Sequence, residues 1–180
     1  MGPDVVQLNA VLIVVGSHLR AEEGDRPLAY RLRSRIEAWR DDHADQLTVP
    51  LTPIVCTDLW YLNHEQLQQR PTVCIGGPGV NAYAALSIQQ VEGAAEVEEL
   101  ERYDPDDPEA LEDTGEQFPG GGGAGEPKVT IMIDPDFTHL RVGIWGTNHE
   151  LTAKGVELFS ERYLDGYLRA CVTQVEPRTE

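Results

Sequence analysis

A continuous apolar run at residues 11–15 is the feature that most constrains the fold of this chain. Its letters, VLIVV, are followed at once by Gly16 and Ser17. A run without polar alternation is typical of a strand whose two faces are both covered, as in a parallel sheet flanked by helices. It is also far shorter than the about 20 apolar residues of a membrane span. We therefore expect an interior strand of a soluble α/β protein.

Helical and strand patterns alternate after this run. We expect helices over 25–42, about 63–69, 82–90 and 148–172, and strands over 53–58, 72–75, 128–133 and 139–146. Asp25 and Asn81 are the predicted caps of two of these helices. The alternation predicts a three-layer, Rossmann-like α/β sandwich with a mainly parallel sheet of about five strands. A short turn joins the last two strands, which favours a C-terminal hairpin and therefore one antiparallel strand.

Residues 92–127 interrupt the alternation. They hold 13 acids and one base, so they supply −12 of the net charge of −17. A composition rich in Asp, Glu, Gly and Pro predicts a solvated, flexible insertion within a single domain that spans residues 1–180. The alternatives to a plain surface loop are a docking surface for a protein partner and a lid over the site. The acidic balance argues against nucleic acid as a partner.

The remaining composition predicts a cytoplasmic protein with no membrane or metal partner. No secretory signal or zinc-binding spacing is present, and no cofactor can be named. Cys56, Cys74 and Cys171 lie in apolar surroundings and form no CxxC pair. We expect all three to be buried free thiols.

Glycines and polar side chains follow four of the predicted parallel strands. The candidate site residues are Ser17, His18, Asp58, Gly76, Gly77, Gly79, Asn81, Thr147, Asn148, His149 and Glu150. The carboxyl ends of parallel strands meet at one edge of a sheet, and α/β proteins bind their ligands there. Asp134 follows the antiparallel strand and is expected at the opposite edge, as is Asp136.

The motif GGPGVN, residues 76–81, has two interpretations. Glycines let a ligand approach the backbone, and the N-terminus of the following helix attracts anions, so Gly76, Gly77, Gly79 and Asn81 are candidate contacts for a phosphate. In the other interpretation the motif is a tight corner in which Asn81 caps the helix.

Structural alternatives also exist for the other candidates. Thr147 and Glu150 have the spacing of a capping box, and in the functional interpretation Thr147, Asn148 and the helix amides bind an anion beside His149 or Glu150 as acid or base. Asp58 is a candidate for a sugar hydroxyl contact or for a catalytic base, or caps local amides. Ser17 and His18 are further ligand candidates, or are solvated.

Two family resemblances follow from these motifs. Residues 76–81 resemble the Gly-Gly-Pro-x-x-Asn turn of α/β domains in some prokaryotic surface-layer and uncharacterised proteins, which implies a Rossmann-like domain without a defined activity. Thr147 and Glu150 are similar to the Thr-x-x-Glu part of the Pro-Gly-Gly-x-Gly-Thr-x-x-Glu motif of lysine-decarboxylase-like nucleotide phosphoribohydrolases. Residues 141–145, RVGIW, stand here in place of the Pro-Gly-Gly start.

Three functions are compatible with the sequence. The first is the binding of a nucleotide or another phosphorylated small molecule at the strand-end loops. The second is an enzyme at the same site, a hydrolase or transferase of N-glycosidic bonds that uses Asp58 or Glu150. The third is a non-catalytic assembly protein that binds its partner through the acidic insertion or through the apolar faces of the helices expected over 25–42 and 148–172.

Overall fold

The computed structural model describes residues 9–93, 100–104, 107–113, 128–134 and 137–175. The strands are β1 (Asn9–Val15), β2 (Leu51–Thr57), β3 (Thr72–Ile75), β4 (Leu100–Asp104), β5 (Asp107–Asp113), β6 (Val129–Met132) and β7 (Arg141–Gly146). The helices are α1 (Leu19–Asp42), α2 (Asp58–Leu62), α3 (Ala82–Gly93), α4 (His149–Arg162) and α5 (Leu164–Val175). Short 3₁₀ turns at Ala44–Gln46 and Glu65–Leu67 complete the order.

The strands form one mixed sheet in the order β2-β1-β3-β7-β6-β4-β5. Strands β2, β1, β3 and β7 are parallel neighbours, and β6 runs antiparallel to β7. This confirms the predicted α/β class, the mainly parallel core of the sheet and the antiparallel strand of the C-terminal hairpin. The sheet is wider than expected, because β4 pairs with β6 and β5 pairs with β4.

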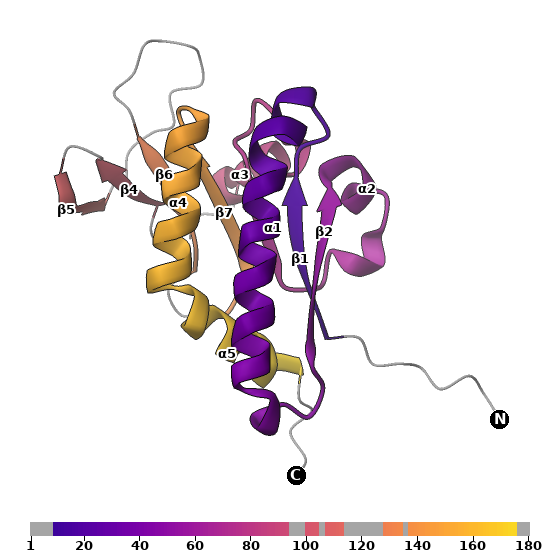
Figure 1. Cartoon of the computed structure of the whole chain (residues 1–180). Helices are drawn as coiled ribbons and strands as arrows, with labels where there is room; N and C mark the ends of the chain where they lie inside the picture. Colours follow the sequence, from indigo (N-terminus) through magenta and orange to yellow (C-terminus); the bar gives the residue numbers. More distant parts are fainter. Residues whose placement is uncertain (1–8, 94–99, 105–106, 114–127, 135–136, 176–180) are drawn as a thin grey trace.

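Helices cover both faces of the sheet (Figure 1). Helices α1, α4 and α5 lie over one face, and α2 and α3 lie over the other. Val11, Ile13 and Val15 belong to the core under α1, α4 and α5, whereas Leu12 and Val14 belong to the core with α2 and α3. The uninterrupted apolar run of β1 is thus explained, since each of its faces supplies a separate core.

Three helix boundaries differ from the sequence prediction. Helix α1 begins at Leu19, six residues before the predicted start, because the side chain of His18 accepts a hydrogen bond from the N–H of Arg20. The predicted 63–69 helix is replaced by α2, which starts at Asp58 under a Thr57 cap, and by a 3₁₀ turn. The predicted 148–172 helix is divided at Tyr163 into α4 and α5.

The charged stretch before the predicted α1 start is helical rather than a loop. Glu22 and Arg26 form an ion pair one helical turn apart, which supports helix over residues 19–26. Pro27 consequently lies inside α1 rather than in its first turn.

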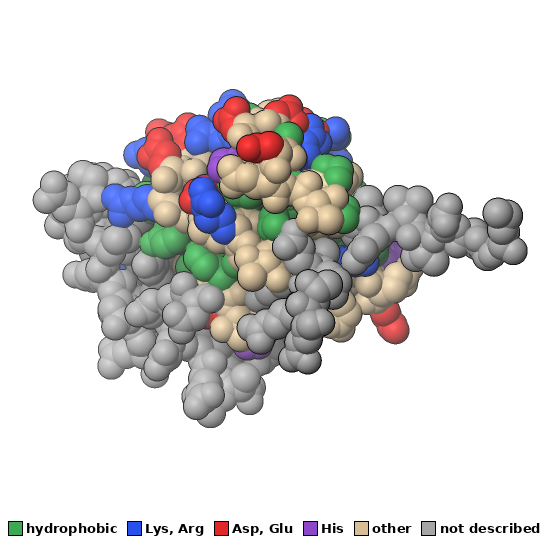
Figure 2. Space-filling view, turned by 90° about the horizontal axis from the view of Figure 1, so that it is seen from below, with side chains coloured by type: hydrophobic (Ala, Val, Ile, Leu, Met, Phe, Trp, Pro, Cys, Tyr) green, Lys and Arg blue, Asp and Glu red, His purple; other side chains and the backbone are tan. Residues whose placement is uncertain are grey.

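The predicted acidic insertion supplies β4 and β5. Its residues 94–99, 105–106 and 114–127 lie outside the described residues. In the described part of the chain, no helix has both the length and the apolar character needed to cross a membrane. At the end of the molecule away from the strand-end loops, charged side chains of both signs are intermixed (Figure 2).

Candidate functional site

The carboxyl ends of four neighbouring strands define the candidate site. Strands β2, β1, β3 and β7 are parallel, and every candidate residue of the sequence prediction follows one of them at this edge. The sheet order reverses between β1 and β3, since β1 leads through α1 to β2 and β3 leads away on its other side. Such a reversal is where open α/β sheets form their ligand crevice. Asp134 follows β6 at the opposite edge, as expected, and Asp136 lies outside the described residues.

Asp58 holds three segments of this edge together. Its Oδ1 accepts hydrogen bonds from the N–H groups of Ser17, at 2.9 Å, and Leu59, at 2.7 Å. Its Oδ2 accepts from the N–H of Ala82 at 2.7 Å, and the residue is only 3% exposed. These contacts tie the end of β1 and the start of α3 to α2. The geometry therefore favours the capping interpretation of Asp58 over a sugar contact or a catalytic base.

Both polar atoms of the Asn81 side chain form hydrogen bonds with the backbone of the protein. Its Oδ1 accepts from the N–H groups of Tyr83, at 3.0 Å, and Ala84, at 3.2 Å, which confirms the predicted cap of α3. Its Nδ2 donates to the carbonyl oxygens of Ile75, at 3.2 Å, and Val14, at 3.4 Å. Asn81 is 1% exposed, so it joins β1 and β3 to α3 and offers a ligand little surface.

The glycine turn has the geometry of a tight corner. The N–H groups of Val80 and Asn81 both donate to the carbonyl of Gly77. Gly76 has φ +99°, a conformation that L side chains rarely adopt, and a Cβ added to Gly16 would lie 1.8 Å from the carbonyl oxygen of Val80. Together with the bonds of Asp58 and Asn81, this packing uses the N–H groups of residues 80–84. Nothing lies within 4 Å of a Cβ built on Gly79.

The predicted capping box at the start of α4 is wrong. Asn148, not Thr147, caps this helix, with its Oδ1 accepting from the N–H of Leu151 at 2.9 Å. The Thr147 hydroxyl instead accepts from the N–H of Lys128 at 3.4 Å, because the chain is still paired with the start of β6 at this point. Glu150 is exposed in the first turn of α4.

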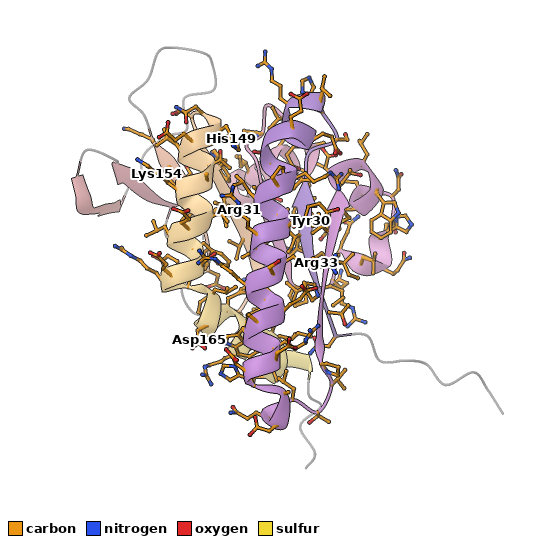
Figure 3. The ribbon with its side chains drawn as sticks, in the orientation of Figure 1. Tyr30, Arg31, Arg33, His149, Lys154 and Asp165 are labelled. Atoms are coloured by element: carbon orange, nitrogen blue, oxygen red, sulfur yellow. The ribbon has the colours of Figure 1, made fainter. Side chains whose placement is uncertain are left out.

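Histidines from two helix starts reach the same edge. His18 caps α1 and is exposed, and Ser17 is exposed beside it. His149 is the first residue of α4, where Figure 3 shows it on the side that faces α1. A Cβ built on Gly24 of α1 would lie 3.0 Å from the Nδ1 of His149, so the glycine makes room for the ring.

Asp25 is the site residue that the sequence prediction assigned wrongly. It is not a helix cap but lies inside α1, in line with the buried residues Leu28, Leu32 and Ile36. It is 7% exposed. A Cβ added to Gly76 would lie 2.5 Å from its Oδ2, so the carboxyl group abuts the glycine turn. Among the described residues, no hydrogen bond to either oxygen of Asp25 is found.

The electrostatics of Asp25 follow from this position. Burial raises the pKa of Asp25, and the positive charge of His149 partly opposes that rise. Within the described residues, the fully buried side-chain atoms that lack a hydrogen-bond partner are Asn9 Oδ1 and Tyr83 Oη, so the oxygens of Asp25 are not sealed in without a partner. Asp25 and His149 thus form the part of the edge where protein contacts leave a polar group unused.

Comparisons with known proteins assign no family to this chain. No family model, no curated protein and no solved structure matches it. Within the described residues, no group of three or more His, Cys, Asp or Glu side chains is placed to hold a metal ion.

Proposed function

We propose that this chain is a Rossmann-like domain that binds a nucleotide or another phosphorylated small molecule at the carboxyl edge of β1, β3 and β7. The observation that carries the proposal is the buried carboxyl group of Asp25. It lies beside the turn at Gly76 and within the electrostatic reach of His149, and the described residues give it no hydrogen bond. A ligand that donates a hydrogen bond to Asp25 would pair this carboxyl group in a position where burial disfavours its charge.

The start of α4 is the proposed contact for the phosphate. The amides of Leu151 and Thr152 are bonded to the side chain and carbonyl of Asn148. The N–H groups of His149 and Glu150 carry no hydrogen bond among the described residues, and a helix N-terminus attracts negative charge. The start of α3 is less suited to this contact, because Asp58 and Asn81 occupy its amides.

A thermal-shift screen tests this function. The full chain is heated with nucleoside monophosphates, nucleosides and sugar phosphates, each also added to the Asp25→Ala and Glu23→Ala variants. A true ligand raises the Tm of the wild type by mass action. Asp25→Ala is expected to lose that increase. Glu23→Ala removes an exposed acid of the same helix and is expected to keep it.

Two outcomes would contradict the proposal. One is a cooperatively melting wild type that no ligand of the panel stabilises, and this result would favour an assembly protein instead. The other is a ligand whose effect on Tm is the same in all three proteins, because its site would then lie away from Asp25.

A further inference from the structure

We infer that Asp25 and His149 together bind a neutral hydroxyl group of the ligand, so that the ligand carries a sugar or polyol part in addition to its phosphate. This inference rests on the proposed function and assigns one chemical group of the ligand to one pair of side chains. Asp25, the first member of this pair, is only 7% exposed. The carboxyl group abuts Gly76 and feels the charge of His149.

An anionic group does not suit this pair. A phosphate against the Asp25 carboxylate would place two negative charges side by side in a poorly solvated position, where like charges repel most strongly. The phosphate is better placed at the exposed start of α4. The two ends of the ligand are thus assigned to different groups of the protein.

A cationic group does not suit it either. His149 is the first residue of α4, so its ring lies at the positive end of that helix dipole. The starts of α1 and α3 lie at the same edge of the sheet. A ligand ammonium at Asp25 would therefore also face the positive end of α4 and the imidazole of His149.

A hydroxyl group meets both side chains at once. Its O–H donates to a carboxylate oxygen of Asp25, and its lone pairs accept from a ring N–H of His149. A neutral hydroxyl group adds no charge to the site. Gly24 lets the ring of His149 pack directly against α1, and Gly76 lets the carboxyl group of Asp25 pack directly against the turn, so glycine contacts hold both side chains in place.

Isothermal titration with matched probes tests the inference. The probes are ribose 5-phosphate against 2-deoxyribose 5-phosphate, and adenosine 5′-monophosphate against its 2′-deoxy and 3′-deoxy forms. We expect loss of the contacting hydroxyl to weaken binding to the wild type about tenfold. In Asp25→Ala the hydroxyl and deoxy forms should bind almost equally. In His149→Ala the difference in affinity between the two forms should shrink, but less than in Asp25→Ala. Asp25→Leu, which likewise has no acceptor for the hydroxyl group, serves as a second variant in case Asp25→Ala does not fold.

The other outcomes separate this inference from the proposed function. If the deoxy forms bind the wild type as tightly as the hydroxyl forms, the hydroxyl assignment is wrong and the binding function stands. If glucosamine 6-phosphate binds more than tenfold more tightly than glucose 6-phosphate, and Asp25→Ala abolishes the difference, the contacting group is a cation and the inference is also overturned. If no probe binds, including inorganic phosphate, the proposed function fails together with it.

Discussion

Two buried aspartates lie at the same edge of the sheet in opposite environments. Asp58 accepts three backbone hydrogen bonds, whereas no hydrogen bond to Asp25 is found among the described residues. Burial raises the pKa of Asp25 and so favours its neutral form. Asp58 consequently stabilises the scaffold through its bonds, whereas Asp25 is the acid that these bonds leave out.

Replacing Asp25 tests this difference through the pH dependence of stability. The folded state raises the pKa of Asp25 above its ordinary value of 3.8. The native state therefore holds this proton more tightly than the unfolded state does. The resulting stabilisation is complete below the ordinary pKa and is lost as the pH rises through the folded pKa. Asp25→Asn, which cannot ionise, should thus be more stable than the wild type at pH 7 and not at pH 3.

Urea or thermal unfolding between pH 3 and pH 8 measures this effect. We expect the Tm of Asp25→Asn to exceed that of the wild type by about 2–4 °C at pH 7, which corresponds to about 1 kcal/mol in a domain of this size. Glu23→Gln, on an exposed position of α1, changes the net charge equally and should show no such increase. A lower Tm for Asp25→Asn at pH 7 would mean that the ionised carboxylate has a stabilising partner.

Two histidines outside the candidate site lie just after helix C-termini, and each makes the same contacts with a tryptophan of its helix. His43 stacks on Trp39 with ring centroids 4.2 Å apart, and His64 stacks on Trp60 at 4.1 Å. In each pair the Nδ1 of the histidine lies within hydrogen-bond distance of the tryptophan carbonyl, at 2.8 and 2.6 Å. A carbonyl only accepts, so Nδ1 is the protonated nitrogen in both rings. These histidines satisfy helix ends and are not candidates for catalysis.

At the scale of elements, Asn81 is expected to be the more important of two helix caps. Asn81→Ala removes the cap of α3 and also leaves the carbonyls of Val14 and Ile75 without its donor. Asn148→Ala removes one hydrogen bond from an exposed cap. We expect losses in the free energy of unfolding of about 2–3 kcal/mol for the first and about 1 kcal/mol for the second.

Urea denaturation followed by circular dichroism compares the two caps. Asn81→Ser provides the intermediate case, since a serine hydroxyl caps a helix but is too short to reach both carbonyls. Equal losses for Asn81→Ala and Asn148→Ala would show that the contacts of Asn81 to β1 and β3 add no stability.

The elements that the sequence predicted best are those with the clearest apolar pattern. Strands β1 and β3 and the start of α3 follow from their apolar runs and from the Asn81 cap. The start of α1 was missed because charges at 20–26 and Pro27 are typical of loops, whereas an i,i+4 ion pair and the His18 cap stabilise helix there. Strands β4 and β5 were missed because their acidic sequences, LERYD and DPEALED, show no regular alternation of apolar residues.

At the scale of the whole molecule, each of the two hydrophobic cores contains at least one cysteine, so thiol reactivity can be used to measure how readily each core opens. Cys56 and Cys74 lie in the core with α2 and α3, and Cys171 lies in the core with α5. Burial raises the pKa of Cys56 to about 11 and that of Cys171 to about 12, and it raises the pKa of Cys74 further. Because the thiolate is the reactive form, native thiols should be unreactive at neutral pH.

Thiol titration with a chromogenic disulfide measures this protection. At pH 8 we expect fewer than one equivalent to react rapidly in the native protein and all three in 8 M urea. A single fast thiol in the native state, identified by mass spectrometry, would show that the layer around that cysteine opens readily.

The location of the candidate site was predictable, whereas its chemistry was not. The order of strands and helices was enough to place residues 16–18, 76–81 and 146–150 at one edge. It could not show that Asp58 and Asn81 are used internally, since those bonds join segments far apart in the chain. The signal for Asp25 was present as an acid at 25 in line with the apolar positions 28, 32 and 36. Because the predicted helix started at Asp25, this residue was interpreted as a cap rather than as part of the buried face of the helix.

Strand β7 lies in the middle of the sheet, between β3 and β6, although it comes last in sequence among the strands that the structure describes. During synthesis, β1, β2 and β3 leave the ribosome before β7 has been made. One edge of β3 therefore stays unpaired until residues 141–146 follow. Such an edge is a template for pairing with another chain. Truncation before β7 should therefore yield a fragment that aggregates rather than a smaller domain, and the growing chain is most vulnerable while residues 76–140 are being made.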